Sequence, residues 1–144
     1  MNRHLFLAML LLASACKTTA PVVPATGTGP LALVYRQPLT LDGPAGSSQL
    51  EFSDVEDSRC PTGAQCIWAG EARVTLSLTQ SGAAPQLVRL GLNASAKGPN
   101  ALPDSLPVVL HRQPYWVRLL AVMPYPSLSG TQGPKVATVR LRPQ

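Results

Sequence analysis

The chain has 144 residues and a net charge of +5, from 12 lysines and arginines against 7 aspartates and glutamates. This length suits one domain. A hydrophobic content of 45% excludes a disordered chain, and 15 prolines with 11 glycines exclude a helical bundle. Three cysteines are too few for a disulfide-dense scaffold or a four-cysteine zinc site, and we expect no metal or other cofactor.

The N-terminal residues follow the order of a secretory signal peptide. Arg3 supplies the positive start, an apolar run covers residues 5–12, and three small residues, 13–15, precede a cleavage site. The apolar run is too short for a transmembrane helix, which needs about 20 residues. We therefore predict a signal peptide over residues 1–15 that is removed from the mature protein.

Cys16 directly follows the small residues, and this arrangement resembles the lipobox of bacterial lipoproteins, whose cysteine becomes the mature N-terminus. The resemblance implies a diacylglyceryl thioether on Cys16 and an acylated amino group. Several acyl chains together make attachment to a membrane effectively permanent. Lys17 stands where inner-membrane lipoproteins tend to carry aspartate, so the resemblance implies the outer membrane of the cell envelope. The alternative is an ordinary secretory cleavage site with an incidental Cys16.

Residues 16–30 are predicted to form a flexible linker that begins at the lipidated cysteine. This segment contains three prolines and shows no apolar periodicity. The remaining residues, 31–144, are enough for one hydrophobic core. We therefore predict a signal peptide, a lipidated linker and a single folded β-sandwich domain, in that order along the chain.

In the folded part, apolar and polar residues alternate with the period of two that is typical of half-buried strands. The clearest runs are 74–78, 88–92 and 137–141, and shorter candidates are 31–35, 39–41 and 50–52. Residues 115–123 are apolar on both faces apart from Arg118, which predicts a central strand. Residues 93–107 are expected to form a long loop. Short strands separated by turn signals predict an all-β fold, an antiparallel β-sandwich or barrel of about seven to eight strands.

Two cysteines, Cys60 and Cys66, enclose a short segment that contains a proline and a glycine. In an exported protein we expect these thiols to be oxidised. If Cys16 carries lipid, as the lipobox implies, they have only each other as partners. We predict a Cys60–Cys66 disulfide that stabilises one loop by about 2 kcal/mol. A metal site at these thiols would need two more soft ligands, and the mature chain offers only His111.

The same region resembles a recurrent group of small bacterial secreted proteins and lipoproteins. The resemblance is carried by Asp-Ser-Arg-Cys-Pro over residues 57–61 and Cys-Ile-Trp-Ala-Gly over residues 66–70. A looser match follows at Pro-Tyr-Pro over residues 124–126. The resemblance implies a domain type and an exported location, and it assigns no catalytic residue.

Asp57, Arg59 and Trp68 are the candidate residues of this loop, and two interpretations of them stay open. In the structural interpretation, Trp68 covers the disulfide and seals one end of the core, while Arg59 pairs with Asp54, Glu56 or Asp57. In the binding interpretation, the rigid loop is displayed to a partner as inhibitor loops are, because a preordered loop loses less entropy on docking. The structural interpretation accounts for every residue of the motif, and we prefer it.

Few residues of the chain match known catalytic or nucleic-acid-binding patterns. His111 is the only histidine outside the predicted signal peptide, so an envelope hydrolase would depend on it. The chain after Glu71 is basic, which favours an anionic surface or an acidic envelope protein as partner. Because these charges are scattered and no dense basic run is present, we do not expect binding to nucleic acid.

We therefore predict a membrane-anchored bacterial lipoprotein of the cell envelope that is not an enzyme and acts as a structural or binding module. The first alternative is a protease-inhibitor-like or ligand-binding domain that acts through the Cys60–Cys66 loop. The second alternative is a hydrolase that uses His111.

Overall fold

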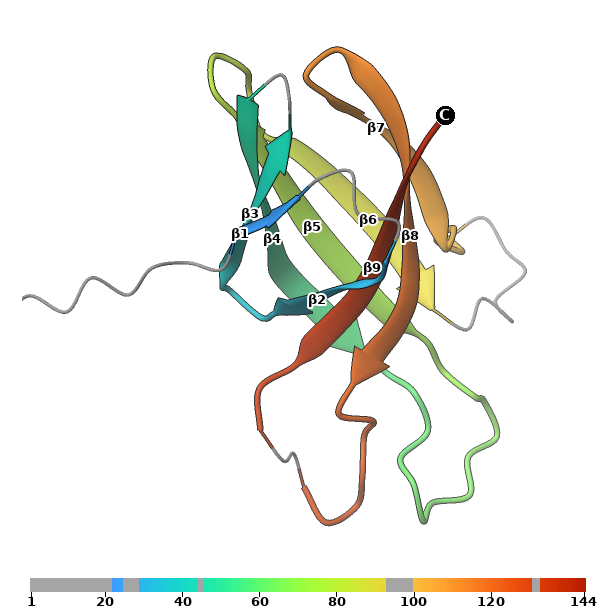
Figure 1. Cartoon of the computed structure of the whole chain (residues 1–144). Helices are drawn as coiled ribbons and strands as arrows, with labels where there is room; N and C mark the ends of the chain where they lie inside the picture. The colour runs from blue at the N-terminus through green and yellow to red at the C-terminus, as the bar shows by residue number, and fades with distance from the viewer. Residues whose placement is uncertain (1–21, 25–28, 44–45, 93–99, 131–132) are drawn as a thin grey trace, which may run out of the picture.

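The computed structural model describes residues 22–24, 29–43, 46–92, 100–130 and 133–144 (Figure 1). Within these residues the chain forms nine β-strands and no helix. The strands are β1 (Val22–Pro24), β2 (Leu31–Val34), β3 (Pro38–Gly43), β4 (Gly46–Asp57), β5 (Ala72–Gln80), β6 (Gln86–Leu92), β7 (Ser105–Leu110), β8 (Gln113–Met123) and β9 (Val136–Pro143).

The strands form two sheets that face each other across a common core. One sheet has the order β1-β3-β4-β5-β6, and the other has the order β2-β9-β8-β7. Neighbouring strands are antiparallel except β1 and β3, which are parallel. Figure 1 shows the second sheet lying across the first. The predicted antiparallel β-sandwich is confirmed. The structure has one strand more than the seven to eight that were predicted, and this additional strand is β1.

The alternation of apolar and polar residues decides which face of each strand enters the core. In β5, Val74, Leu76 and Leu78 are buried, while the residues between them are partly exposed. The predicted strands at β6 and β9 follow the same rule. Phe52 is fully buried at the centre of this core and packs edge-to-face on Tyr35, with ring centroids 5.4 Å apart.

β4 extends on both sides of the run predicted for it, residues 50–52: residues 46–49 are glycine and polar residues, and a β-bulge after Phe52 reverses the side-chain alternation. The pairing of β4 with β5 shifts between Phe52 and Asp54. Before the bulge, Leu50 and Phe52 lie in the core, and after it Val55 packs against the core. A search for a period of two therefore detects only the part of the strand before the bulge.

β8 lies in the middle of its sheet, between β9 and β7, as predicted for residues 115–123. It is not buried on both faces, because Trp116 and Arg118 are exposed on its outer side. A second bulge, between Leu119 and Ala121, reverses the alternation of side chains. Core-facing apolar residues therefore have odd numbers before the bulge and even numbers after it, which makes the strand look apolar on both faces in the sequence. The outer face of β8 is open to solvent.

Two segments predicted to lack regular structure contain strands. Val22–Pro24, within the predicted flexible linker, forms β1 and pairs with β3. Ser105–Leu110 forms β7, so the loop predicted over residues 93–107 ends earlier than expected. Pro107 argues against a strand in the sequence, because proline has no backbone N–H group to donate to a neighbouring strand. β7 tolerates it as the edge strand of its sheet.

The predictions for the N-terminus fall outside the described residues. This applies to the signal peptide over residues 1–15, to Cys16 and to the first residues of the linker. Within the part of the chain that the structure describes, no segment forms a long apolar helix of the kind that crosses a bilayer.

Candidate functional site

The loop between β4 and β5 continues the hairpin ladder beyond the ends of both strands. The Ser58 amide donates to the Glu71 carbonyl at 2.9 Å, and the Cys60 amide donates to the Ala69 carbonyl at 2.9 Å. Cys60 and Cys66 form the predicted disulfide, with their Cα atoms 5.9 Å apart. The loop is therefore closed both by backbone hydrogen bonds and by a covalent bridge.

Gly70 allows the two sides of this loop to approach closely. Its φ is +67°, and a Cβ atom at this position would lie 1.9 Å from the Ser58 carbonyl oxygen. A side chain therefore has no space here, and glycine is the residue that adopts such a φ at little cost. The narrow base of the loop depends on this residue.

A buried ion pair holds the base of the loop. Arg59 Nε donates to Asp57 Oδ1 at 2.7 Å, and Arg59 Nη2 donates to Asp57 Oδ2 at 2.8 Å, which makes the pair bidentate. The Lys135 ammonium donates to the same carboxylate. The side chains of Arg59 and Asp57 are only 3% and 8% exposed, so each charge depends on its partner instead of water. Of the three acidic partners considered for Arg59, the structure selects Asp57.

Arg59 also joins the β4–β5 loop to the loop between β8 and β9. Its Nη2 donates to the Val122 carbonyl at 2.9 Å, and its guanidinium lies over the Tyr125 ring, 4.2 Å from the centroid. A backbone hydrogen bond of 2.9 Å from the Thr62 amide to the Pro126 carbonyl adds a second link. The two loops are thus held to each other as one unit.

We call the described residues of 58–71 and 124–135 the loop pair, and Figure 1 shows both loops extending from the same end of the sandwich. Ile67 is 95% exposed and Trp68 is 81% exposed at this end. The expectation that Trp68 covers the disulfide and seals the core is therefore wrong. Trp68 lies beyond the last backbone hydrogen bond between the two sides of the loop, from the Cys60 amide to the Ala69 carbonyl, so the hairpin ladder does not direct it inward.

Exposed large apolar side chains concentrate on the loop pair. Among the described residues, five of the eight such side chains belong to it or adjoin it: Ile67, Trp68, Met123, Tyr125 and Leu128. Leu128 lies against the β4–β5 loop, because a Cβ on Gly63 would be 3.7 Å from its Cδ1 atom. A group of apolar side chains on a rigid base is typical of an interaction site.

Sequence reasoning assigns Trp68 to this site, whereas Ile67 and Tyr125 enter it only as members of the quoted motifs. A signal for Ile67 was present, because Ile67 and Trp68 are consecutive. Consecutive residues of a strand point to opposite faces, so a core could accept only one of them. The Pro-Tyr-Pro motif could not show that Tyr125 contacts Arg59, because this contact joins segments that are far apart in the sequence.

The ionisation of Asp57 follows from its surroundings. Burial of the carboxylate acts to raise its pKa, but hydrogen bonds from Arg59 and Lys135, together with their positive charges, outweigh this effect. The pKa of Asp57 is therefore lowered from its ordinary value of 3.8. The carboxylate stays charged at neutral pH and neutralises the cations that hold the loop pair.

His111 lies in the tight turn between β7 and β8. Its Nε2 is 2.8 Å from Ser48 Oγ, and its amide donates to Gln80 Oε1 at 2.6 Å. His111 and Arg112 have φ values of +47° and +66°, as in a two-residue hairpin turn of type I′. Ser48 is only 3% exposed, and no described carboxylate orients the imidazole as in a catalytic triad. These contacts give His111 a structural role in the turn.

Comparison with known proteins adds no relative. The chain matches no protein-family model, no curated protein and no solved structure. Within the described residues, no three side chains of the histidine, cysteine, aspartate and glutamate types gather as metal ligands. A function for this chain therefore has to be inferred from the geometry of the loop pair.

Gly70→Ala is expected to destabilise the fold by about 3 kcal/mol or more, because its Cβ would collide with the Ser58 carbonyl. Gly82→Ala is the matched control. Gly82 has a φ of +75° and nothing within 4 Å of the added Cβ, so only a left-handed backbone cost of about 1 kcal/mol remains. Urea unfolding followed by far-ultraviolet circular dichroism measures both. Equal midpoints for the two variants would contradict the close approach.

Asp57→Asn is expected to lower stability at pH 7 by about 3–5 kcal/mol, because the charge of Arg59 then lacks its buried partner. A carboxylate with a lowered pKa stabilises the fold above its unfolded pKa of about 3.9 and loses this effect as the pH falls through its folded pKa. Urea midpoints of the native chain should therefore fall more steeply below about pH 4 than those of the variant. The exposed Asp42→Asn is the control, and parallel curves for the native chain and Asp57→Asn would refute the assignment.

Proposed function

We propose that this protein is a binding module of the bacterial cell envelope that engages a partner protein through the loop pair. The observation that carries the proposal is the exposure of Ile67 and Trp68, 95% and 81%, on a loop closed by the Cys60–Cys66 disulfide. Large apolar side chains in water are unfavourable, and burial in a partner removes this cost.

The rigidity of the loop pair supports binding. The disulfide and the buried Arg59–Asp57 pair order the loop before any partner arrives. An ordered loop loses little conformational entropy on docking, and tryptophan is among the residues that contribute most at protein interfaces. A partner that suits this surface has an apolar pocket wide enough for the indole of Trp68.

Inhibition of an endoprotease is the second candidate function. The observation in its favour is that Ile67 and Trp68 directly follow a disulfide that limits the movement of the loop. Such an inhibitor would act on a protease whose cleft accepts large apolar side chains. The hydrolase hypothesis for His111 has no comparable support, because the serine beside it is buried.

The proposed location is the outer membrane of the cell envelope, with the chain anchored through lipid on Cys16. The N-terminal sequence supports this location by its resemblance to lipoprotein signals. The Cys60–Cys66 disulfide also supports it, since disulfides persist in exported proteins and are rare in the cytosol. The lipid anchor would hold the loop pair near the membrane where its partner lies.

Trp68→Ala is expected to weaken partner binding by at least about tenfold, because truncating a central aromatic contact costs about 2 kcal/mol or more. The partner is first captured in cells that make the full chain with a photoreactive phenylalanine analogue at position 68. It is then identified by mass spectrometry, purified and titrated against the native chain and the variant. A captured endoprotease that the native chain inhibits would establish the second candidate.

Leu87 provides the matched control for this experiment, because it is 70% exposed but lies on β6, away from the loop pair. The photoreactive residue at position 87 should not capture the same protein, and Leu87→Ala should bind as the native chain does. Identical crosslinks at both positions, or an unchanged affinity of Trp68→Ala, would contradict a binding role for the loop pair.

Cys16→Ala is expected to abolish lipid attachment, because the thioether needs the sulfur atom. Cells grown with labelled fatty acid should label the native chain, and its intact mass should fit a chain that begins at residue 16 and carries acyl groups. Cys60→Ser is the control and should keep the label. Recovery of an unmodified native chain from the soluble fraction would show that the anchor does not exist.

A further inference from the structure

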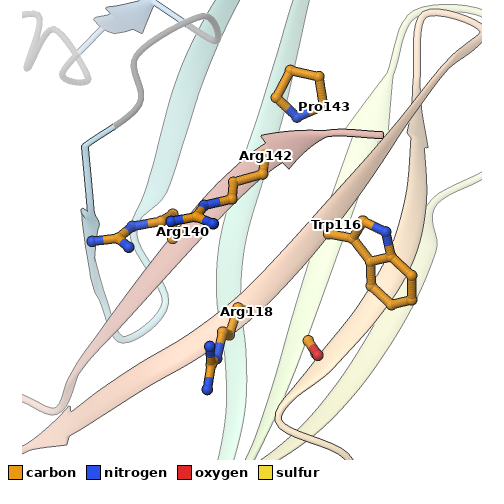
Figure 2. A pocket seen from close by; sticks show the side chains of 6 residues that line it. Trp116, Arg118, Arg140, Arg142 and Pro143 are labelled. Carbon is orange, nitrogen blue, oxygen red and sulfur yellow. The ribbon is translucent and has the colours of Figure 1, made fainter.

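A pocket on the outer face of the second sheet gathers three arginines and a tryptophan (Figure 2). Its volume is about 380 Å³, and its lining comes from β7, β8 and β9: Ser105, Trp116, Arg118, Arg140, Arg142 and Pro143. None of these residues belongs to the loop pair. The pocket is therefore a second candidate site, separate from the proposed function.

Strand pairing brings the four large side chains together. Trp116 lies opposite Arg142, and Arg118 lies opposite Arg140, in the ladder between β8 and β9. Directly opposed residues have Cβ atoms about 5 Å apart, and residues two positions apart on a strand share a face. Figure 2 shows Arg140 and Arg142 extending from β9 to one side, Arg118 extending from β8 below them, and the Trp116 indole on the opposite side of β8. Basic residues that are scattered in the sequence thus form one cluster.

The positive charge of the cluster is only partly neutralised. Arg118 Nε and Nη2 each lie 2.9 Å from Asp104 Oδ2. Arg140 and Arg142 pair with no carboxylate in the described part of the chain, and Arg140 Nε is buried without a hydrogen-bond partner there. These four side chains, three guanidinium groups and one carboxylate, together carry a charge of 3 − 1 = +2.

We propose that this pocket binds a phosphate monoester whose carbon skeleton packs on Trp116. A phosphomonoester carries a charge of about −1.5 to −2 at pH 7, which matches the charge of the cluster. Guanidinium groups bind phosphate oxygens with paired hydrogen bonds. The indole of Trp116 is 45% exposed and offers an apolar surface to the attached skeleton. The phosphate source is either a soluble sugar phosphate or the headgroup of a lipid.

The test uses the full chain in detergent micelles with Trp68→Phe, which leaves Trp116 as the single tryptophan. Glucose 6-phosphate is titrated while Trp116 fluorescence and the heat of binding are recorded. We expect saturable binding that weakens with added salt, because the contacts are exposed charges. It should also weaken below about pH 6, where the phosphate gains a proton. Glucose alone should not bind, and inorganic phosphate should bind less tightly.

Arg140→Gln and Arg142→Gln should each raise the dissociation constant by about tenfold, because each removes a charged donor from the phosphate. Arg89→Gln is the matched control, since it removes the same charge from an exposed position on the other sheet. The proposal is overturned by an absence of both heat and fluorescence change. Equal binding of glucose, or an equal loss in Arg89→Gln, also overturns it.

Phosphatidic acid in the micelles distinguishes the two sources of phosphate. If the pocket takes lipid headgroups, this lipid competes and raises the apparent dissociation constant of glucose 6-phosphate. If the pocket takes soluble phosphates alone, the constant is unchanged. Either result requires the phosphate site. The fluorescence signal is independent of the loop pair, because Trp68 is absent from the titrated chain.

Discussion

The bidentate contact between the Arg59 guanidinium and the Asp57 carboxylate is the interaction on which the functional end of this protein depends. It lies where β4 ends, reaches the backbone of β8 through the Val122 carbonyl, and supports the Tyr125 ring. The disulfide closes only its own loop, whereas this pair holds two loops to the sandwich. Because both charges are buried, any movement that separates them exposes an uncompensated charge, so the loops keep one relative position.

Most of the fold could be predicted from the sequence, because a sheet with one buried face requires alternation. The strands with uninterrupted alternation, β5, β6 and β9, are the ones the pattern locates best. β4 and β8 were predicted less well because each contains a bulge that changes parity. β1 and β7 were not predicted because β1 has only three residues and ends in a proline, and because Pro107 interrupts the apolar run of β7.

The candidate sites were only partly accessible from sequence. The Cys60–Cys66 disulfide could be predicted from the expected export of the protein and from the number of its cysteines. The partner of Arg59 could be limited to three nearby acidic residues. The direction of Trp68 could not be inferred, because it depends on where the hairpin ladder between β4 and β5 ends. The arginine cluster depends on strand register, since Arg118 and Arg140 meet only when β8 and β9 pair.

Neither of the two indoles of the chain is in the core, whose side chains are aliphatic apart from Phe52. Trp68 is 81% exposed, so chemical denaturation will change the surroundings of its ring little, whereas Trp116, 45% exposed, loses the neighbours that cover part of its ring. Tryptophan emission is well placed to change when something covers either surface. The emission of Trp68 therefore reports occupancy of the loop pair better than it reports folding.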